Sequence, residues 1–345
     1  ALDAIAECLK PIIEQHGPES VAIFCGNGAL LHATSFTMQR SFLAALGSPQ
    51  FFTTLTIDQS AKLVSFGRLG AWAAGMPELG QMDMALMFGT NPLISHSSLG
   101  FLTADPVKRL KDARARGFKL VTVDPRMSET ASQADLALRP LPGWDPAICA
   151  AMIRTLIDRG VHDAAFCERF VGVQRMANLR AAVEPFDPNW VEQGAGLCAG
   201  DIGRVCDMFA ERKGFACAYG ATGPNMAPFS NLAQHLIDTI NVICGSFLRE
   251  GDMRTQTIVQ DRFNAPVAAV IGGDRPWEQG PPSRIRGAGM FYGERLSATL
   301  PDEILTPGDG QIRALIVIGG DPATSLPDQV KAVEALRSLE LLVAI

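Results

Sequence analysis

Residues 119–131 read KLVTVDPRMSETA, and the fold prediction rests on this segment. Four apolar or β-branched residues, Leu120–Val123, are typical of a buried strand, and they run straight into Asp124, Pro125 and Arg126. Ligands of open α/β sheets bind at the carboxyl ends of the strands. This strand end therefore fits either a ligand contact, in which Asp124 binds a ribose diol or the donor edge of a purine, or a local ion pair between Asp124 and Arg126.

Similar apolar runs recur along the chain and alternate with helical patterns. The predicted strands are Val21–Cys25, Met84–Phe88, Leu120–Val123, Leu136–Leu138, Phe215–Tyr219, Leu315–Ile318 and Leu341–Ile345. The predicted helices are the N-terminal segment, Ser35–Leu46, Pro106–Arg116, Pro146–Arg159, Gly200–Glu211, Asn231–Cys244 and Gln329–Leu339. This alternation indicates βαβ units, so we predict an α/β fold with two intertwined Rossmann-like domains and mostly parallel sheets.

The order of these elements also suggests the domain organisation. One domain would be continuous, at about 51–255, and the other would combine about 1–50 with 256–345, because the strand Val21–Cys25 needs partners. Gly and Pro cluster between about 264 and 310 with little periodicity, which predicts a long loop.

Composition excludes several function classes. The net charge of −6 argues against nucleic acid as a partner, and no apolar run is long enough to span a membrane. The N-terminal helix lacks the basic start of a secretion signal, so we expect a cytoplasmic protein, with a periplasmic location left open. The eight cysteines are scattered without a C-x-x-C pair. We therefore interpret them as buried thiols and not as a disulfide, zinc or iron–sulfur framework.

An internal repeat joins two distant parts of the chain. ALMFGTNPLISHSS (85–98) matches LIVIGGDPATSLPD (315–328): each is a strand followed by G-[TG]-[ND]-P and a serine three residues after the proline. The helix and strand that follow also match, so that Ile345 corresponds to Val123. Two such loops predict two similar ligand-binding halves. Because the chain stops one residue before the counterpart of Asp124, we expect it to be a fragment of a longer polypeptide.

Polar loops follow the other predicted strands as well. Gly89 and Thr90 would let backbone amides approach an anion, and Asn91 could donate from its side chain. An ordinary strand-to-helix turn explains the same residue types. Asp145 could cap a helix that starts at Pro146, or it could face a bound base. Gly220 and Asn225 belong to another polar loop, which follows the strand Phe215–Tyr219. No G-x-G-x-x-G motif occurs in the position that a standard dinucleotide-binding fold requires.

Together these segments resemble the molybdopterin oxidoreductases of the dimethyl-sulfoxide reductase and formate dehydrogenase type. The resemblance rests on the G-T-N-P loop and on residues 122–147, 219–252 and 315–328. It implies a molybdenum or tungsten ion bound by two pterin dithiolenes, each carrying a guanine nucleotide, with one pterin nucleotide in each α/β domain. The cofactor-binding positions that it implies are Gly89, Thr90, Asn91, Asp124, Arg126, Asp145, Gly220, Asn225, Gly319, Gly320 and Asp321.

The chain departs from the family pattern at several points. The cysteine cluster of the family's N-terminal iron–sulfur centre and its C-terminal pterin-closing domain are not in this sequence, so an iron–sulfur cluster is expected only in the full-length protein. The metal-ligand segment, 47–67, contains no cysteine. Asp58 stands at about the ligand position, and its carboxylate would suit oxidised molybdenum. Ser60 is the rival ligand, and Asp58 could instead cap the helix that starts near Gln59.

The resemblance implies an enzyme that catalyses redox or oxygen-atom transfer on a small substrate, with Asp58 as metal ligand and catalytic residue. An electron-transfer subunit would be its partner, and this piece alone would be inactive. Two alternatives remain. One is a non-catalytic relative, such as the large iron–sulfur subunit of respiratory complex I. The other is an unrelated α/β enzyme that binds a nucleotide cofactor such as flavin or thiamine diphosphate.

Overall fold

The computed structural model describes residues 1–96, 105–212, 214–252 and 268–345, which form two compact units. Unit 1 consists of Ala1–Ser60 and Arg275–Ile345, and unit 2 of Ala61–Asp274. The domain boundary predicted near residue 255 lies outside the described residues.

Unit 2 is built on a sheet of four parallel strands. Their order is β6 (Leu136–Leu138), β5 (Lys119–Val123), β4 (Met82–Phe88) and β7 (Phe215–Gly220). Phe88 pairs with Val123 on one side and with Gly220 on the other. The carboxyl ends of these strands therefore form one continuous edge, as the prediction of a parallel sheet requires.

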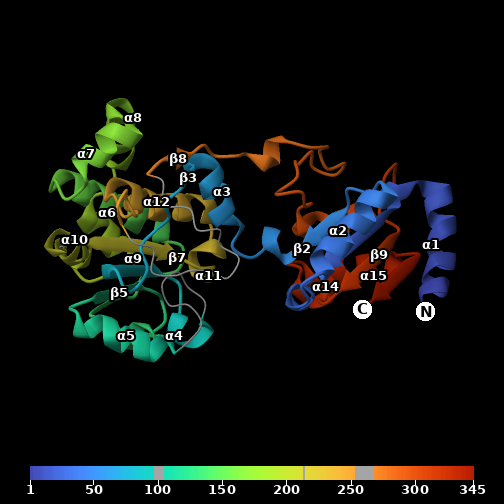
Figure 1. Ribbon diagram of the computed structural model, residues 1–345, viewed down its shortest axis with the longest axis horizontal. Coiled ribbons are helices and arrows are strands. Elements are labelled where there is room, and N and C mark those ends of the chain that lie inside the picture. Colours follow the sequence, from blue (N-terminus) through green and yellow to red (C-terminus); the bar gives the residue numbers. More distant parts are fainter. Residues whose placement is uncertain (97–104, 213, 253–267) are drawn as a thin grey trace. The chain divides into compact units, whose positions relative to one another are not determined.

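Helices cover both faces of this sheet, because successive side chains of a strand point to opposite faces. Leu86 and Phe88 pack against the helices on one face, whereas Ala85 and Met87 pack on the other. In Figure 1, α5 lies on one side of the sheet and α6 and α10 lie on the other. The helices on these faces are α5 (Pro106–Ala115), α6 (Asp145–Asp158), α9 (Pro188–Ala195), α10 (Asp201–Glu211) and α12 (Ser230–Ile243).

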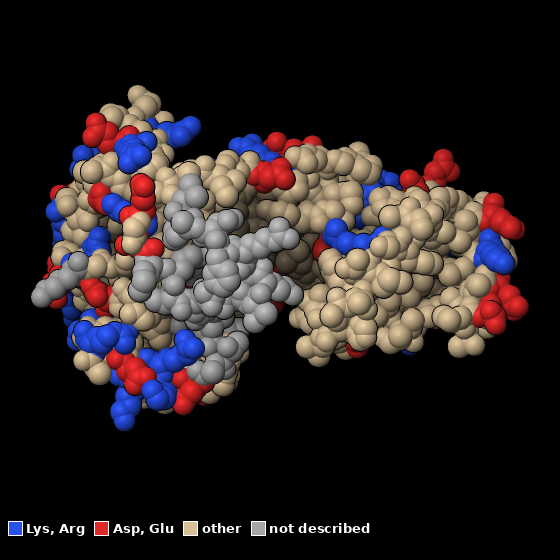
Figure 2. Space-filling view, in the orientation of Figure 1, with Lys and Arg blue, Asp and Glu red and all other residues tan. Residues whose placement is uncertain are grey.

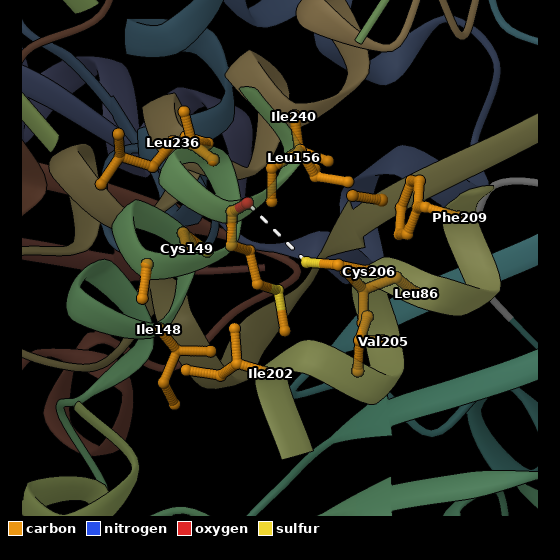
Figure 3. Close-up of a cluster of buried hydrophobic side chains, with 14 of the residues drawn as sticks. Leu86, Ile148, Cys149, Leu156, Ile202, Val205, Cys206, Phe209, Leu236 and Ile240 are labelled. Carbon is orange, nitrogen blue, oxygen red and sulfur yellow. Dashed lines mark hydrogen bonds between the residues drawn. The ribbon is translucent and has the colours of Figure 1, made fainter. Parts of the chain in front are cut away.

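Figure 3 shows the larger core, in which Leu86 of β4 meets side chains of α6, α10 and α12. Cys206 lies within it, and its Sγ donates to the backbone oxygen of Met152 at 3.8 Å. Burial raises the pKa of the Cys206 thiol to about 12. Of the eight cysteines, only Cys8 and Cys198 are exposed, which confirms the interpretation of the others as small buried hydrophobes.

Unit 2 also contains short elements. Two of them, β3 and β8, form an antiparallel strand pair that was not predicted from the sequence. These elements are α3 (Ser60–Leu69), β3 (Ala71–Trp72), α4 (Pro92–Ser95), α7 (Ala164–Phe166), the π-helix η5 (Cys167–Val171), α8 (Val173–Val183), α11 (Thr222–Asn225) and β8 (Val270–Ile271).

Unit 1 repeats the three-layer arrangement. Its parallel strands lie in the order β10 (Leu341–Ala344), β9 (Ala314–Ile318), β1 (Val21–Cys25) and β2 (Phe51–Thr53). Val21 and Ile23 pack with α1 and α2, and Ala22 and Phe24 pack with α13 and α15. The helices of unit 1 are α1 (Leu2–His16), α2 (Ser35–Leu46), α13 (Leu300–Leu305), α14 (Pro322–Ser325) and α15 (Gln329–Ser338), with 3₁₀ turns at Pro18–Ser20, Asn27–Leu31, Thr54–Thr56, Pro276–Glu278 and Ser297–Thr299.

The Gly- and Pro-rich region is more ordered than the predicted long loop. Phe291 and Glu294 exchange both backbone hydrogen bonds, at 2.8 and 3.1 Å. The residues between them, Tyr292 and Gly293, have φ values of 54° and 77°. Two consecutive left-handed residues make a tight two-residue hairpin turn. The turn places the Glu294 side chain in the interior of unit 1, where it is 2% exposed.

The surface differs between the units. Positive and negative side chains intermingle over α5 (Figure 2), where Lys108 and Asp112 form an ion pair at 2.5 Å. Uncharged side chains dominate the face of unit 1 that carries α2 (Figure 2), and Met38 and Phe42 of α2 are exposed. Within the described ranges, the helices are too short or too polar to cross a membrane.

Candidate functional site

The strand-end edge of unit 2 is organised around Gly89, which follows β4. Its backbone N–H donates to the oxygen of Val123 at 2.9 Å, and its oxygen accepts from the N–H of Gly223 at 3.0 Å. The N–H of Ala221 donates to Phe88 at 3.2 Å. The loops after three neighbouring strands are thus joined through their backbones.

Unit 1 contains the same pattern around Gly319, which follows β9. Its N–H donates to the oxygen of Ile345 at 3.0 Å, and its oxygen accepts from the N–H of Gly28 at 3.0 Å. The N–H of Gly26 donates to Ile318 at 2.9 Å. The internal repeat is therefore present in the backbone, and Ile345 occupies the place of Val123.

Both edges bring glycines into close contact. A Cβ on Gly89 would lie 2.6 Å from the Cα of Gly223, and a Cβ on Gly320 would lie 2.7 Å from the Cα of Gly26. Gly89 and Gly319 also have positive φ values, 52° and 62°. Side chains are excluded at these positions because the backbone of the neighbouring loop fills the space.

The side chain of Asn91 makes hydrogen bonds within the chain. Its Nδ2 donates to Glu129 at 2.7 Å, and its Oδ1 accepts from the N–H and the hydroxyl of Thr130 at 3.1 and 2.7 Å. The side chain thus ties the loop after β4 to the loop after β5. Thr90 beside it is buried, so its hydroxyl is not presented to solvent.

Asp124 and Arg126 do not form the local ion pair that the sequence left open. The Oδ1 of Asp124 accepts from the backbone N–H of Arg126 at 2.8 Å, whereas the Arg126 guanidinium lies 3.6 Å from Glu129. The Asp124 carboxylate is half-buried at the strand end. Arg126 points to solvent, with its side chain 67% exposed.

Asp145 is the first residue of α6, and Trp144 holds the cap position. The prediction that Asp145 caps a helix starting at Pro146 is therefore wrong by one residue. Burial raises the pKa of the Asp145 carboxyl, and the charge of Asp124 raises it further. Two carboxyl groups thus act on each other at one strand-end edge, where they could accept from adjacent N–H groups of a ligand.

The loop after β7 contributes Gly220 and Asn225. A Cβ on Gly220 would lie 2.6 Å from the Oε1 of Gln234. The Nδ2 of Asn225 donates to Ala221 at 2.9 Å and to Gln234 at 3.3 Å. Its Oδ1 is buried and has no hydrogen-bond partner within the described part of the chain. A buried acceptor of this kind can receive a hydrogen bond from a ligand.

Asp321 takes the position of Asn91 in unit 1 but makes only local bonds. Its Oδ1 accepts from the N–H of Ala323 at 3.0 Å and its Oδ2 from the hydroxyl of Thr324 at 2.8 Å. It therefore caps α14. The adjacent Gly319 and Gly320 are exposed at the strand end.

Asp58 lines a pocket of about 280 Å³ in unit 1. The side chain is exposed, and its backbone N–H donates to Thr54 at 2.9 Å. The following helix begins at Ser60. The pocket also contains Cys25, Gly26, Asn27, Leu30, Phe36, Thr53, Thr54, Leu55 and Glu294.

Two parts of the unit 1 pocket were not predicted from the sequence. They are Glu294 and the G-N-G turn at residues 26–28. Glu294 accepts from the hydroxyl of Thr53 and lies 3.6 Å from Arg40, and burial raises the pKa of its carboxyl. The G-N-G motif directly follows a predicted strand, and this position could have identified it as a third glycine loop. Nothing in the sequence pattern indicated that Glu294 would be buried.

The donor set limits the kind of metal that fits. No group of three or more His, Cys, Asp or Glu side chains that could hold a metal occurs among the described residues. The described residues therefore offer no site for a metal bound mainly by protein side chains. A metal carried by its own cofactor, with one carboxylate such as Asp58 as protein ligand, is compatible with the pocket.

A family model described as molybdopterin oxidoreductase matches residues 1–345. The chain belongs to the molybdopterin oxidoreductase family. Among curated relatives, it is 28% identical to the thiosulfate reductase molybdopterin-containing subunit PhsA of Salmonella typhimurium over 92% of this chain and 39% of the relative. It is 26% identical to formate dehydrogenase H of Escherichia coli over 64% of this chain and 30% of the relative.

Structural similarity supports the same fold for this molybdopterin oxidoreductase chain. Acetylene hydratase from Pelobacter acetylenicus superimposes with a TM-score of 0.77 at 22% identity, covering 100% of this chain and 49% of that one. This confirms the predicted α/β fold with mostly parallel sheets. The chain spans less than half the length of these relatives.

Proposed function

We propose that this chain is the cofactor-binding core of a molybdenum or tungsten oxidoreductase that uses two pterin guanine dinucleotides. The observation that carries the proposal is the backbone pattern shared by Gly89 and Gly319 at equivalent strand ends of the two units. Two equivalent glycine edges suit a cofactor with two equivalent halves. They are harder to explain for an enzyme with one flavin or thiamine diphosphate.

In unit 2, different residues of the strand-end edge would contact different parts of the nucleotide. The turn at Gly89 and Thr90 would let phosphate oxygens come close to the strand end, with the N–H of Thr90 as the donor, because the N–H of Gly89 is bonded to Val123. The carboxylates of Asp124 and Asp145 would accept from the N–H groups of guanine. The unpartnered Oδ1 of Asn225 would accept from another ligand N–H.

In unit 1, the glycines at residues 26–28 and 319–320 would make the corresponding approach, with Asp321 beside them. Asp58 is proposed as the protein ligand of the metal, with Ser60 as the alternative. When bound, the metal supplies the redox or oxygen-atom transfer chemistry. This chain orients the cofactor and shapes the surroundings of the metal.

For the substrate and the partners we propose only a chemical or functional class. The relatives are named for different small molecules, including thiosulfate, formate, nitrate and acetylene. We propose a small-molecule substrate without choosing among these. Two relatives are named as enzyme subunits, which supports an electron-transfer subunit as partner of the complete protein.

The test is cofactor loading of the complete polypeptide, made in a host that synthesises the pterin cofactor. We expect Asp124→Ala to lower both bound metal, measured by mass spectrometry, and guanine nucleotide released by acid. Asp207→Ala is the control, because Asp207 is on α10 and pairs with Arg159. Full loading of Asp124→Ala would refute the assigned role.

The same measurement separates the alternatives. A non-catalytic relative of the complex I type would contain neither molybdenum nor tungsten when isolated from that host. A flavin or thiamine enzyme would release that cofactor and no guanine nucleotide.

A further inference from the structure

Unit 2 contains a cavity of about 390 Å³, separate from the Asp58 pocket of unit 1. Its described lining includes none of the residues predicted to bind the cofactor. The cavity lies among α3, β3, α8 and α12, and its volume is in the range of sites for small organic ligands.

One wall of the cavity is aromatic and rigid. The rings of Trp72 and Phe170 are 4.8 Å apart at an interplanar angle of 86°, and Trp72 and Phe166 are 5.2 Å apart. Phe247 lies 5.8 Å from Trp72. The indole N–H of Trp72 donates to the backbone oxygen of Leu248 at 2.6 Å, which fixes the ring. This wall is preformed and apolar, so it suits a flat or branched apolar group.

Two arginines with free guanidinium groups line the same cavity. Arg68 on α3 and Arg175 on α8 are both exposed, and neither pairs with an acid within the described residues. Two other arginines of this unit are paired, Arg180 with Asp158 at 3.0 Å and Arg249 with Asp163 at 2.5 Å. Among the described residues, the cavity is therefore lined by two arginines without an acid partner.

The acid in the cavity lining, Asp238, pairs with neither arginine within the described residues. Burial raises the pKa of its carboxyl, whereas Ser65, Gln234 and the charge of Lys62 oppose the shift. The Oδ1 of Asp238 accepts from the Nε2 of Gln234 at 3.0 Å. Asp238 is thus held by a neighbour on its own helix, and the arginines remain available to an anion.

We infer that this cavity binds a small amphipathic organic anion, with its apolar or aromatic body against Trp72 and Phe170 and its acid group at Arg68 and Arg175. An inorganic anion would leave the aromatic wall in water. A neutral hydrocarbon would leave both cations unused. Its described lining shares no residue with the proposed cofactor site, so the inference does not depend on the proposed function.

The test compares two fluorescent probes on the 345-residue chain. Anilinonaphthalene sulfonate has an aromatic body and one negative charge, and N-phenyl-1-naphthylamine has a similar body without a charge. We expect one saturable site for the sulfonate, with energy transfer from tryptophan that falls in Trp72→Phe and not in Trp277→Phe. The double variant Arg68→Gln, Arg175→Gln should lower the binding affinity for the sulfonate about tenfold and leave the affinity for the neutral probe unchanged.

Arg337→Gln is the matched control, because Arg337 is an exposed arginine on α15 of unit 1. An equal loss of sulfonate affinity in this control and in the double variant would show general charge attraction and overturn the proposal. Equal binding of both probes to the parent chain would overturn the anionic preference. Absence of saturable sulfonate binding would overturn the site itself.

Discussion

Gly89 and Gly223 touch backbone to backbone, so that a methyl group on either residue would lie 2.6 Å from the Cα of the other. The contact joins the loop after β4 to the loop after β7, and the N–H of Gly223 donates to the oxygen of Gly89 at 3.0 Å. The two glycines therefore set how closely two strand ends approach. This spacing defines the edge at which we place a nucleotide.

The first prediction concerns this contact. Gly89→Ala should lower the free energy of unfolding by about 3 kcal/mol or more, because it adds a steric clash to an unfavourable left-handed conformation. Gly160→Ala is the control: Gly160 has a φ of 67° with nothing within 4 Å of an added Cβ. Its cost should be only about 1–2 kcal/mol, the conformational part. Urea unfolding measures both variants, and equal losses would contradict the importance of the contact.

The second prediction separates Asn91 from Asp321, which are equivalent in the repeat. Asn91→Ala removes bonds to Glu129 and Thr130 that join two loops, and it should cost about 2 kcal/mol of unfolding free energy. Asp321→Ala removes only a local helix cap and should cost about 1 kcal/mol. Urea unfolding of the two variants measures the difference. A loss in Asn91→Ala no larger than that in Asp321→Ala would show that the inter-loop bonds contribute nothing.

The regular elements could be predicted from the sequence because their patterns are local. Helix Ser35–Leu46 was predicted at its observed bounds, and the strands at Val21–Cys25 and Leu136–Leu138 likewise. The strand at Phe51–Thr53 was missed, because its two phenylalanines run directly into polar threonines and make no longer apolar run. It exists because the edge of β1 supplies its hydrogen bonds.

The site was only partly predictable, because its bonds join residues far apart in the chain. The sequence identified Asn91, but its partner Glu129 lies 38 positions away. The equivalence of Gly28 and Gly223 depends on hydrogen bonds to Gly319 and Gly89, and the two loops share little sequence. Tertiary contacts of this kind leave no signal in a single sequence.

The third prediction concerns thiol reactivity. Only Cys8 and Cys198 are exposed, and burial raises the pKa of thiols such as Cys244, to about 12. Thiolates react and buried neutral thiols do not. The folded chain should therefore titrate with an aromatic disulfide reagent at two thiols, and the unfolded chain at all eight. Changing Cys8 and Cys198 together to Ser should abolish the fast reaction of the folded chain with the reagent. A third fast thiol would show that one of the buried cysteines is accessible.

The last prediction follows from the raised pKa of Asp145, which burial causes first and the charge of Asp124 increases. A carboxyl whose pKa is higher in the folded state stabilises the fold fully below its unfolded pKa, near 4, and loses this contribution as pH rises through the folded pKa. Asp145→Asn remains neutral throughout. The parent chain should therefore lose stability relative to Asp145→Asn as pH rises from about 4 towards neutrality, measured by urea unfolding at matched ionic strength.

Asp124→Asn provides the internal control for this titration. It removes the neighbouring charge and keeps an oxygen that can accept from the backbone N–H of Arg126. In that background the pKa of Asp145 should fall towards its ordinary value. The pH-dependent difference in stability between Asp124→Asn and the double variant Asp124→Asn, Asp145→Asn should therefore be smaller than the difference between the parent chain and Asp145→Asn. An unchanged pH dependence would mean that the two carboxyl groups do not act on each other, and the paired recognition of guanine by Asp124 and Asp145 would lose its electrostatic basis.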